Sequence, residues 1–139
     1  MNTEMWDPNA GTSSNSDTSN YQLDNDFLKW IVDTYKIDDL SHFKTLLTEV
    51  EIKKHRDIMF LTKEVWFEAL ENFNDVELIA LIHFFTLAAV HFNNWHAEDK
   101  SPVISIAKLL RKRKHSLDKK LLIWIKNNNK NKFLPFGPL

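Results

Sequence analysis

The polar segment from Asn93 to Lys100 holds the side chains best suited to chemistry. It places an imidazole, an indole and two carboxylates within a few residues of one another, and a further histidine precedes it. Imidazole and carboxylate groups transfer protons when a cleft shifts their pKa values, and both bind zinc or iron. The candidate polar site comprises His91, Trp95, His96, Glu98 and Asp99.

This segment lacks the partners that an enzyme needs. The spacing of His91 and His96 matches no common metal-ligand motif, and the sequence has no nucleophile elbow, no phosphate-binding glycine loop and no cysteine. A capped loop between helices, with Trp95 folded back on the core, accounts for the same residues. We therefore predict a non-enzymatic protein with no catalytic residue, metal or cofactor, and an enzyme that uses this loop is the alternative.

The basic residues that follow form a second candidate site. Residues 1–79 hold 7 Lys and Arg against 16 Asp and Glu, whereas residues 80–139 hold 11 against 3. The net charge of −1 conceals this division, which points to charged partners. The predicted partner- or nucleic-acid-binding residues are Lys108, Arg111, Lys112, Arg113, Lys114, Lys119 and Lys120.

Three interpretations of the basic segment are open. Cations along two helices and a short turn could contact a phosphate backbone, and such binding would depend little on base sequence because few side chains here suit base reading. Lysine-rich helix faces are also common as plain solvated surfaces. In the third interpretation the acidic half of the chain faces the basic half, within one domain or between two copies.

The C-terminal residues 131–139 predict an extended apolar hook. Two prolines and a glycine exclude a helix there, while three large apolar side chains argue against a solvated tail. We expect these side chains to lie in a groove, preferably on this domain and otherwise on a partner. The residues of the hook are Phe133, Leu134 and Phe136.

Helices are the elements that must position all of these groups. From Gln22 to Phe136 the chain has no glycine and only two prolines, which leaves few routes to tight hairpin turns. Residues with capping side chains precede stretches of helical apolar spacing. The predicted helix starts are Asp24 or Asn25, Ser41, Thr62, Asn74, Ser101 before Pro102, and Ser116.

The fourth predicted helix, from about Asp75 to Asn93, is apolar nearly all round and should be buried on every side. Its histidines, His83 and His91, are expected as neutral imidazoles within the core or at its rim. The predicted fold class is all-α: a compact single-domain bundle of about six helices around this central helix. Residues 1–22 predict a disordered tail and residues 23–130 the helical domain.

These observations predict a small protein-interaction module, such as an adaptor, an inhibitor or an immunity-type protein, which uses a charge-divided surface to bind a protein partner or another copy of itself. Sequence-nonspecific nucleic-acid binding through residues 108–132 is the alternative. No apolar run reaches membrane-spanning length without ionisable groups, and no signal-peptide pattern begins the sequence. We therefore expect a cytoplasmic protein without membrane contact.

Overall fold

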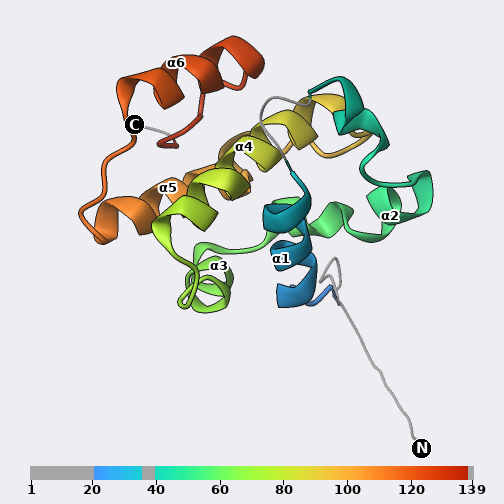
Figure 1. Cartoon of the computed structure of the whole chain (residues 1–139), viewed down its shortest axis with the longest axis horizontal. Helices are drawn as coiled ribbons and strands as arrows, with labels where there is room; N and C mark the ends of the chain where they lie inside the picture. The colour runs from blue at the N-terminus through green and yellow to red at the C-terminus, as the bar shows by residue number, and fades with distance from the viewer. Residues whose placement is uncertain (1–20, 36–39, 138–139) are drawn as a thin grey trace, which may run out of the picture.

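The computed structural model describes residues 21–35 and 40–137, which form an all-α fold (Figure 1). Its α-helices are α1 (Asn25–Thr34), α2 (Glu49–Lys54), α3 (Lys63–Ala69), α4 (Asp75–His91), α5 (Pro102–Lys112) and α6 (Lys119–Asn128). Three 3-10 helices, Leu40–Thr45, Arg56–Phe60 and Glu98–Lys100, lie between them. Within the described ranges there is no strand, and no helix is long and apolar enough to cross a membrane.

Side-chain caps fix where the helices begin. At the start of α4, Asn74 accepts a hydrogen bond from the N–H of Glu77, and the Glu77 carboxylate accepts one from the N–H of Asn74, both at 2.8 Å. This reciprocal capping box satisfies two of the backbone donors that a helix start leaves unpaired. Asp24, Thr62 and Ser101 each cap their helix with a single side-chain hydrogen bond, so four predicted helix starts are confirmed, including that at Asn74.

The second predicted helix is wrong in its start, although Phe43 and Leu47, which follow Ser41, are buried. Ser41 lies inside the 3-10 helix Leu40–Thr45, and α2 begins only after Thr48. The Thr48 hydroxyl accepts from the N–H of Glu51 at 3.1 Å, and the Glu51 carboxylate accepts from the N–H of Thr48 at 2.8 Å. This capping box starts the helix at Glu49, and Val50 in its first turn is 76% exposed.

The cap of the sixth helix lies two residues later than its predicted position at Ser116. Asp118 caps it, with Oδ1 accepting from the N–H of Leu121 at 2.8 Å. Because α5 ends at Lys112, the two helices are separate and are joined by residues 113–118. Ser116 therefore lies in the turn between them.

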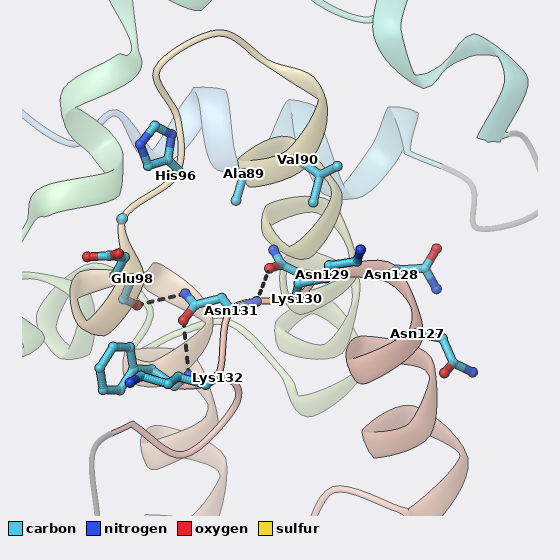
Figure 2. A pocket seen from close by; sticks show the side chains of 12 residues that line it. Ala89, Val90, His96, Glu98, Asn127, Asn128, Asn129, Lys130, Asn131 and Lys132 are labelled. Carbon is cyan, nitrogen blue, oxygen red and sulfur yellow. Dashed lines mark hydrogen bonds between the residues drawn. The ribbon is translucent and has the colours of Figure 1, made fainter.

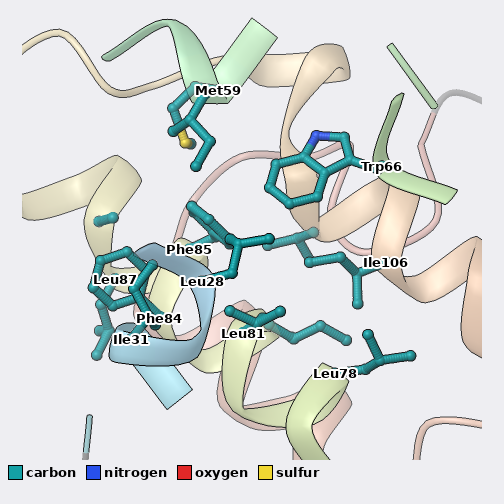
Figure 3. Packing of buried hydrophobic residues seen from close by; sticks show 14 of the residues in the cluster. Leu28, Ile31, Met59, Trp66, Leu78, Leu81, Phe84, Phe85, Leu87 and Ile106 are labelled. Atoms are coloured by element: carbon teal, nitrogen blue, oxygen red, sulfur yellow. The ribbon is translucent and has the colours of Figure 1, made fainter. Parts of the chain in front are cut away.

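The helices α4 and α5 form the centre of the molecule, lying side by side in Figure 1. α4 is buried on several sides, which confirms its predicted central place, and α5 buries more than one face. Figure 3 shows Leu28 of α1, Trp66 of α3 and Ile106 of α5 converging on Leu81 and Phe85 of α4. Since each fully buried large apolar side chain contributes roughly 1.5–3 kcal/mol, this single cluster is the main source of stability.

Tyr21, which the sequence places in the predicted tail, contacts the helical domain. The predicted disordered tail lies outside the described residues except for Tyr21 and Gln22. The Tyr21 hydroxyl lies 2.9 Å from His55 Nδ1, and the two rings meet edge to face. Burial, together with the negative charges of Asp24 and Asp57, raises the pKa of Tyr21 to about 12.

The C-terminal segment forms turns instead of the predicted extended hook. The Leu134 N–H donates to the Asn131 carbonyl at 3.2 Å, and the Gly137 N–H donates to the Phe133 carbonyl at 2.6 Å. Leu134 is buried, so the segment packs on its own domain. Gly137 has φ +85°, and a Cβ there would lie 3.2 Å from the side chain of Ile104, so this position suits glycine alone.

Candidate functional site

Most of the predicted cations meet at the α5–α6 corner, which we define as residues 111–120. α5 ends there in a Schellman turn, in which the His115 N–H donates to the Leu110 carbonyl and the Lys114 N–H to the Arg111 carbonyl, both at 2.9 Å. Lys114 occupies the left-handed position of this turn, with φ 61°, where glycine is usual. Between residues 100 and 139 the only acidic residue is Asp118.

Three cations of the corner have no partner within the described part of the chain. Lys114, Lys119 and Lys120 are exposed, and no described carboxylate lies within ion-pair distance of them. Asp118, the acid nearest to them in sequence, directs Oδ1 to the backbone at the start of α6. The corner therefore presents three lysines that lack a described ion-pair partner, against the single carboxylate of Asp118.

Two further cations of the corner stand over aromatic rings. The Arg111 guanidinium lies 5.6 Å from the ring centre of Phe136, and the Lys112 ammonium lies 5.5 Å from that of Phe67. Such contacts contribute about 0.5–1 kcal/mol at exposed sites, so these cations help to hold the C-terminal segment and α3. Lys108, also predicted as a binding residue, is half-buried on α5 outside the corner.

Arg113 is turned into the protein and has a structural role. Its guanidinium donates to the carbonyl oxygens of Phe73 at 2.6 Å, Leu70 at 3.1 Å and Glu71 at 3.2 Å, and to Asp75 Oδ1 at 3.2 Å. These carbonyls follow the end of α3, where no helical N–H remains to pair with them. The sequence grouped Arg113 with the exposed cations, whereas the structure makes it the cap of α3.

The acidic half of the sequence meets the basic half at Asp75. Its Oδ1 pairs with Arg113, and its Oδ2 lies 3.4 Å from Nδ1 of His115. Asp75 lies in the first turn of α4, where a negative charge also stabilises the helix. At Asp75, therefore, the acidic half of the chain contacts the basic half within one domain. This is one of the two arrangements in the third interpretation of the basic segment.

A cavity of about 520 Å³, which we call the corner cavity, opens beside these cations. Its walls come from α4, from the turn before α6 and from α6 itself. Clefts of this size accept small molecules or the side chains of a partner. The lining residues are apolar at Ile79, Leu121 and Trp124 and polar at His83, His115, Ser116, Asp118 and Lys120.

His83 is the buried polar group of the corner cavity. It is 7% exposed, and its Nδ1 is enclosed without a hydrogen-bond partner among the described residues. Burial lowers the pKa of His83 to about 4, against the opposing effect of the Asp118 charge, so the ring is neutral near pH 7. A neutral imidazole carries one donor and one acceptor nitrogen, so this buried ring can form hydrogen bonds that the described protein does not supply.

The candidate polar site of the sequence is brought together only in part, since His96 and Glu98 line one groove while Trp95 does not. Trp95 is buried, and its Nε1 donates to the Ile52 carbonyl at 2.8 Å, which fastens the loop to α2. No group of three His, Asp or Glu side chains in the described ranges could hold a metal ion. The other members of the predicted site, His91, His96, Glu98 and Asp99, are exposed.

A groove of about 600 Å³ separates this loop from the C-terminal segment (Figure 2). Its amide side chains attach that segment to the domain. Asn131 donates to the Glu98 carbonyl at 2.9 Å and accepts from the N–H of Phe133 at 3.0 Å, and Asn129 donates to the Thr86 carbonyl at 2.9 Å. Because these amides already have partners, the groove offers less for ligand binding than the corner cavity does.

The corner cavity is not visible in the sequence. His83 was expected as a neutral imidazole of the core or its rim, and its contact with Trp124 depends on how α6 packs against α4. The available signal was a single imidazole in the middle of an apolar helix. A polar group at such a position needs either a partner or an opening.

Comparisons of this chain with protein-family models, with curated proteins and with solved structures find no match in any of the three.

Proposed function

We propose that this chain is a non-enzymatic protein-interaction module that recognises an acidic protein surface through its α5–α6 corner. The observation that supports this most strongly is the exposure of Lys114, Lys119 and Lys120, which have no ion-pair partner among the described residues, together with a cavity that Lys120 lines. Like charges close together repel one another, and an acidic partner would remove that repulsion.

The cations and the cavity would have different roles in binding. Surface charges speed the encounter of two proteins and make binding sensitive to salt, whereas buried aromatic and aliphatic contacts provide most of the affinity. Trp124 and Leu121 are the apolar groups that a partner could cover here. An adaptor, an inhibitor or an immunity-type protein would all use such a surface, and a chain without cysteine suits a reducing compartment such as the cytoplasm.

Sequence-nonspecific nucleic-acid binding through residues 108–132 is the alternative. Aromatic rings beside cations favour it, since bases stack on such rings, and Phe67 and Phe136 have this arrangement. Against it, both rings are already covered by a cation, and Arg113 is committed to the end of α3. The protein-binding function therefore fits the geometry better.

A photo-reactive residue in the corner distinguishes these functions. Benzoylphenylalanine replaces Ser116 in the full-length protein, which is irradiated in the cells that produce it, and the same residue in place of Val50 on α2 is the control. We expect a protease-sensitive adduct from position 116 only, and its loss when Lys119→Glu and Lys120→Glu are added. A nuclease-sensitive adduct would favour the alternative, and a cross-linked second copy would make the chain self-associating. Equal adducts from both positions, or none, would overturn the proposal.

A further inference from the structure

We infer that the corner cavity receives a tyrosine side chain from an acidic segment of the partner, with His83 as its hydrogen-bonding group. This inference rests on the proposed function and names the residue that the recognised surface would insert. It follows from three properties of the cavity: its apolar walls, its buried imidazole and the distribution of charge at its rim.

The walls favour an aromatic side chain. Ile79 and Leu121 provide aliphatic surface, and Trp124 provides an indole that already meets the His83 ring edge to face. Aromatic rings gain from further offset or edge-to-face contacts in addition to the burial of apolar area. A ring inserted here would therefore bind better than an aliphatic side chain of similar volume.

The imidazole favours a ring that carries a hydroxyl. His83 lines the cavity with the small part of its ring that is exposed. Its Nδ1 is enclosed, so the nitrogen available to an occupant is Nε2, which has no hydrogen-bond partner among the described residues. A purely apolar occupant would cover the His83 imidazole and displace water without offering a hydrogen bond in return. Covering a polar group in this way is unfavourable. A phenol hydroxyl can donate or accept, so it can pair with either tautomer of the neutral ring.

The rim favours acidic residues on both sides of the tyrosine but not inside the cavity. Lys120 lies at the rim, and Lys114 and Lys119 belong to the same corner. Asp118 also lines the cavity, so a carboxylate inserted deeply would meet a like charge. The occupant that suits both conditions is a neutral tyrosine flanked by Asp or Glu.

Three blocked peptides test this directly: acetyl-Glu-Asp-Glu-Tyr-Glu-Asp-Glu-amide and its forms with Phe or Ala at the centre. Each is titrated by calorimetry into the full-length protein in low salt and in high salt. We expect the tyrosine peptide to bind at least about tenfold more tightly than the alanine peptide and several-fold more tightly than the phenylalanine peptide. All three should weaken in high salt.

Matched variants on α6 locate the site. Lys120→Glu and Trp124→Leu change residues of the cavity, and Lys126→Glu and Ile123→Ala change exposed residues of the same helix that do not line it. We expect Lys120→Glu to weaken every peptide and Trp124→Leu to remove only the preference for tyrosine, while the two controls bind as the natural protein does. Because Lys120 is exposed, its variant should fold even if Trp124→Leu does not, and circular dichroism checks both.

The outcomes separate the two proposals. Equal affinities for the tyrosine and alanine peptides, lost in Lys120→Glu, would overturn the tyrosine site and leave acidic recognition standing. A tyrosine preference that persists in a folded Trp124→Leu would also overturn the site. Absence of binding by all three peptides in low salt would overturn both proposals.

Discussion

His83 and Trp124 meet edge to face, with ring centres 4.3 Å apart, where α6 packs against the central helix α4. The same pair lines the corner cavity, so the packing of the last helix also creates the candidate binding site. A buried neutral imidazole is thereby placed within reach of whatever enters between the two helices. The stability of the domain and the chemistry of the cavity both depend on whether the His83 imidazole is protonated.

Stability should fall as the pH is lowered through the range in which unfolded His83 gains a proton. The pKa of His83 is about 4 in the folded state and 6.5 when unperturbed, so between these values the unfolded chain binds a proton that the folded chain does not. The stabilisation is complete above pH 6.5 and is lost towards pH 4, by roughly 2–3 kcal/mol for this residue. Urea unfolding across this range measures it.

The matched control for this prediction is His83→Gln, which cannot titrate. His55 and His91, whose pKa values are also lowered by burial, contribute in the same direction in both proteins. The difference between the natural protein and the variant therefore isolates His83, which faces Tyr35 and Asp118. Identical pH dependence in the two proteins would contradict the assignment of a buried imidazole.

Replacement of Arg113 by alanine should destabilise the domain by about 2–4 kcal/mol. The variant removes the side-chain donor of the carbonyls of Phe73, Leu70 and Glu71 and the ion-pair partner of Asp75 Oδ1. Arg113→Lys should restore little, because an ammonium group cannot reproduce the forked geometry. Lys112→Ala, a neighbouring change that removes only the contact with the Phe67 ring, should cost no more than about 1 kcal/mol, and a similar loss in both variants would refute the capping role.

Lys114→Gly should stabilise the fold by about 1 kcal/mol while weakening the binding of acidic peptides. The gain arises because glycine adopts φ 61° without the cost that a side chain imposes, and the weaker binding follows from the missing cation. Thermal unfolding and peptide titration of one variant report both effects. The control Lys112→Gly, in the last turn of α5, should instead lose stability.

Leu134→Ala should cost about 3 kcal/mol, because the side chain is buried and its removal leaves a cavity. Phe136→Ala, a larger truncation at a residue that is 42% exposed, should cost less than half as much. Denaturant unfolding of both variants compares them. Equal small effects would mean that the C-terminal segment is only loosely attached to the domain.

Much of the fold could be predicted because its signals are local. The apolar run of α4 and the caps at Asn74 and Ser101 depend on residues close together in sequence. The predicted start of α2 at Ser41 was wrong, although the true start has an equally local signal. That signal is the capping box at Thr48, which outweighs the apolar spacing that follows Ser41. Local capping chemistry therefore fixes helix ends more firmly than apolar periodicity does.

The candidate site could be predicted only in part because it depends on contacts between distant residues. The density of cations at the corner is visible in the sequence, but the role of Arg113 depends on carbonyl groups about 40 residues earlier in the chain. The corner cavity likewise joins His83 to residues of α6. Composition indicates which charges are available, and packing decides which of them remain free to bind.

Retention of the protein partner at low and high salt tests the central claim most directly. The natural chain, the double variant Lys119→Glu with Lys120→Glu, and the control Lys53→Glu with Lys54→Glu are compared by co-purification. The acidic substitutions on α6 lie in its first turn, where negative charge is compatible with the helix, so loss of folding is not expected. The natural chain and the control should retain the partner at low salt and lose it at high salt, and the α6 variant should lose it at both. Retention by the α6 variant at low salt would contradict recognition through the α5–α6 corner.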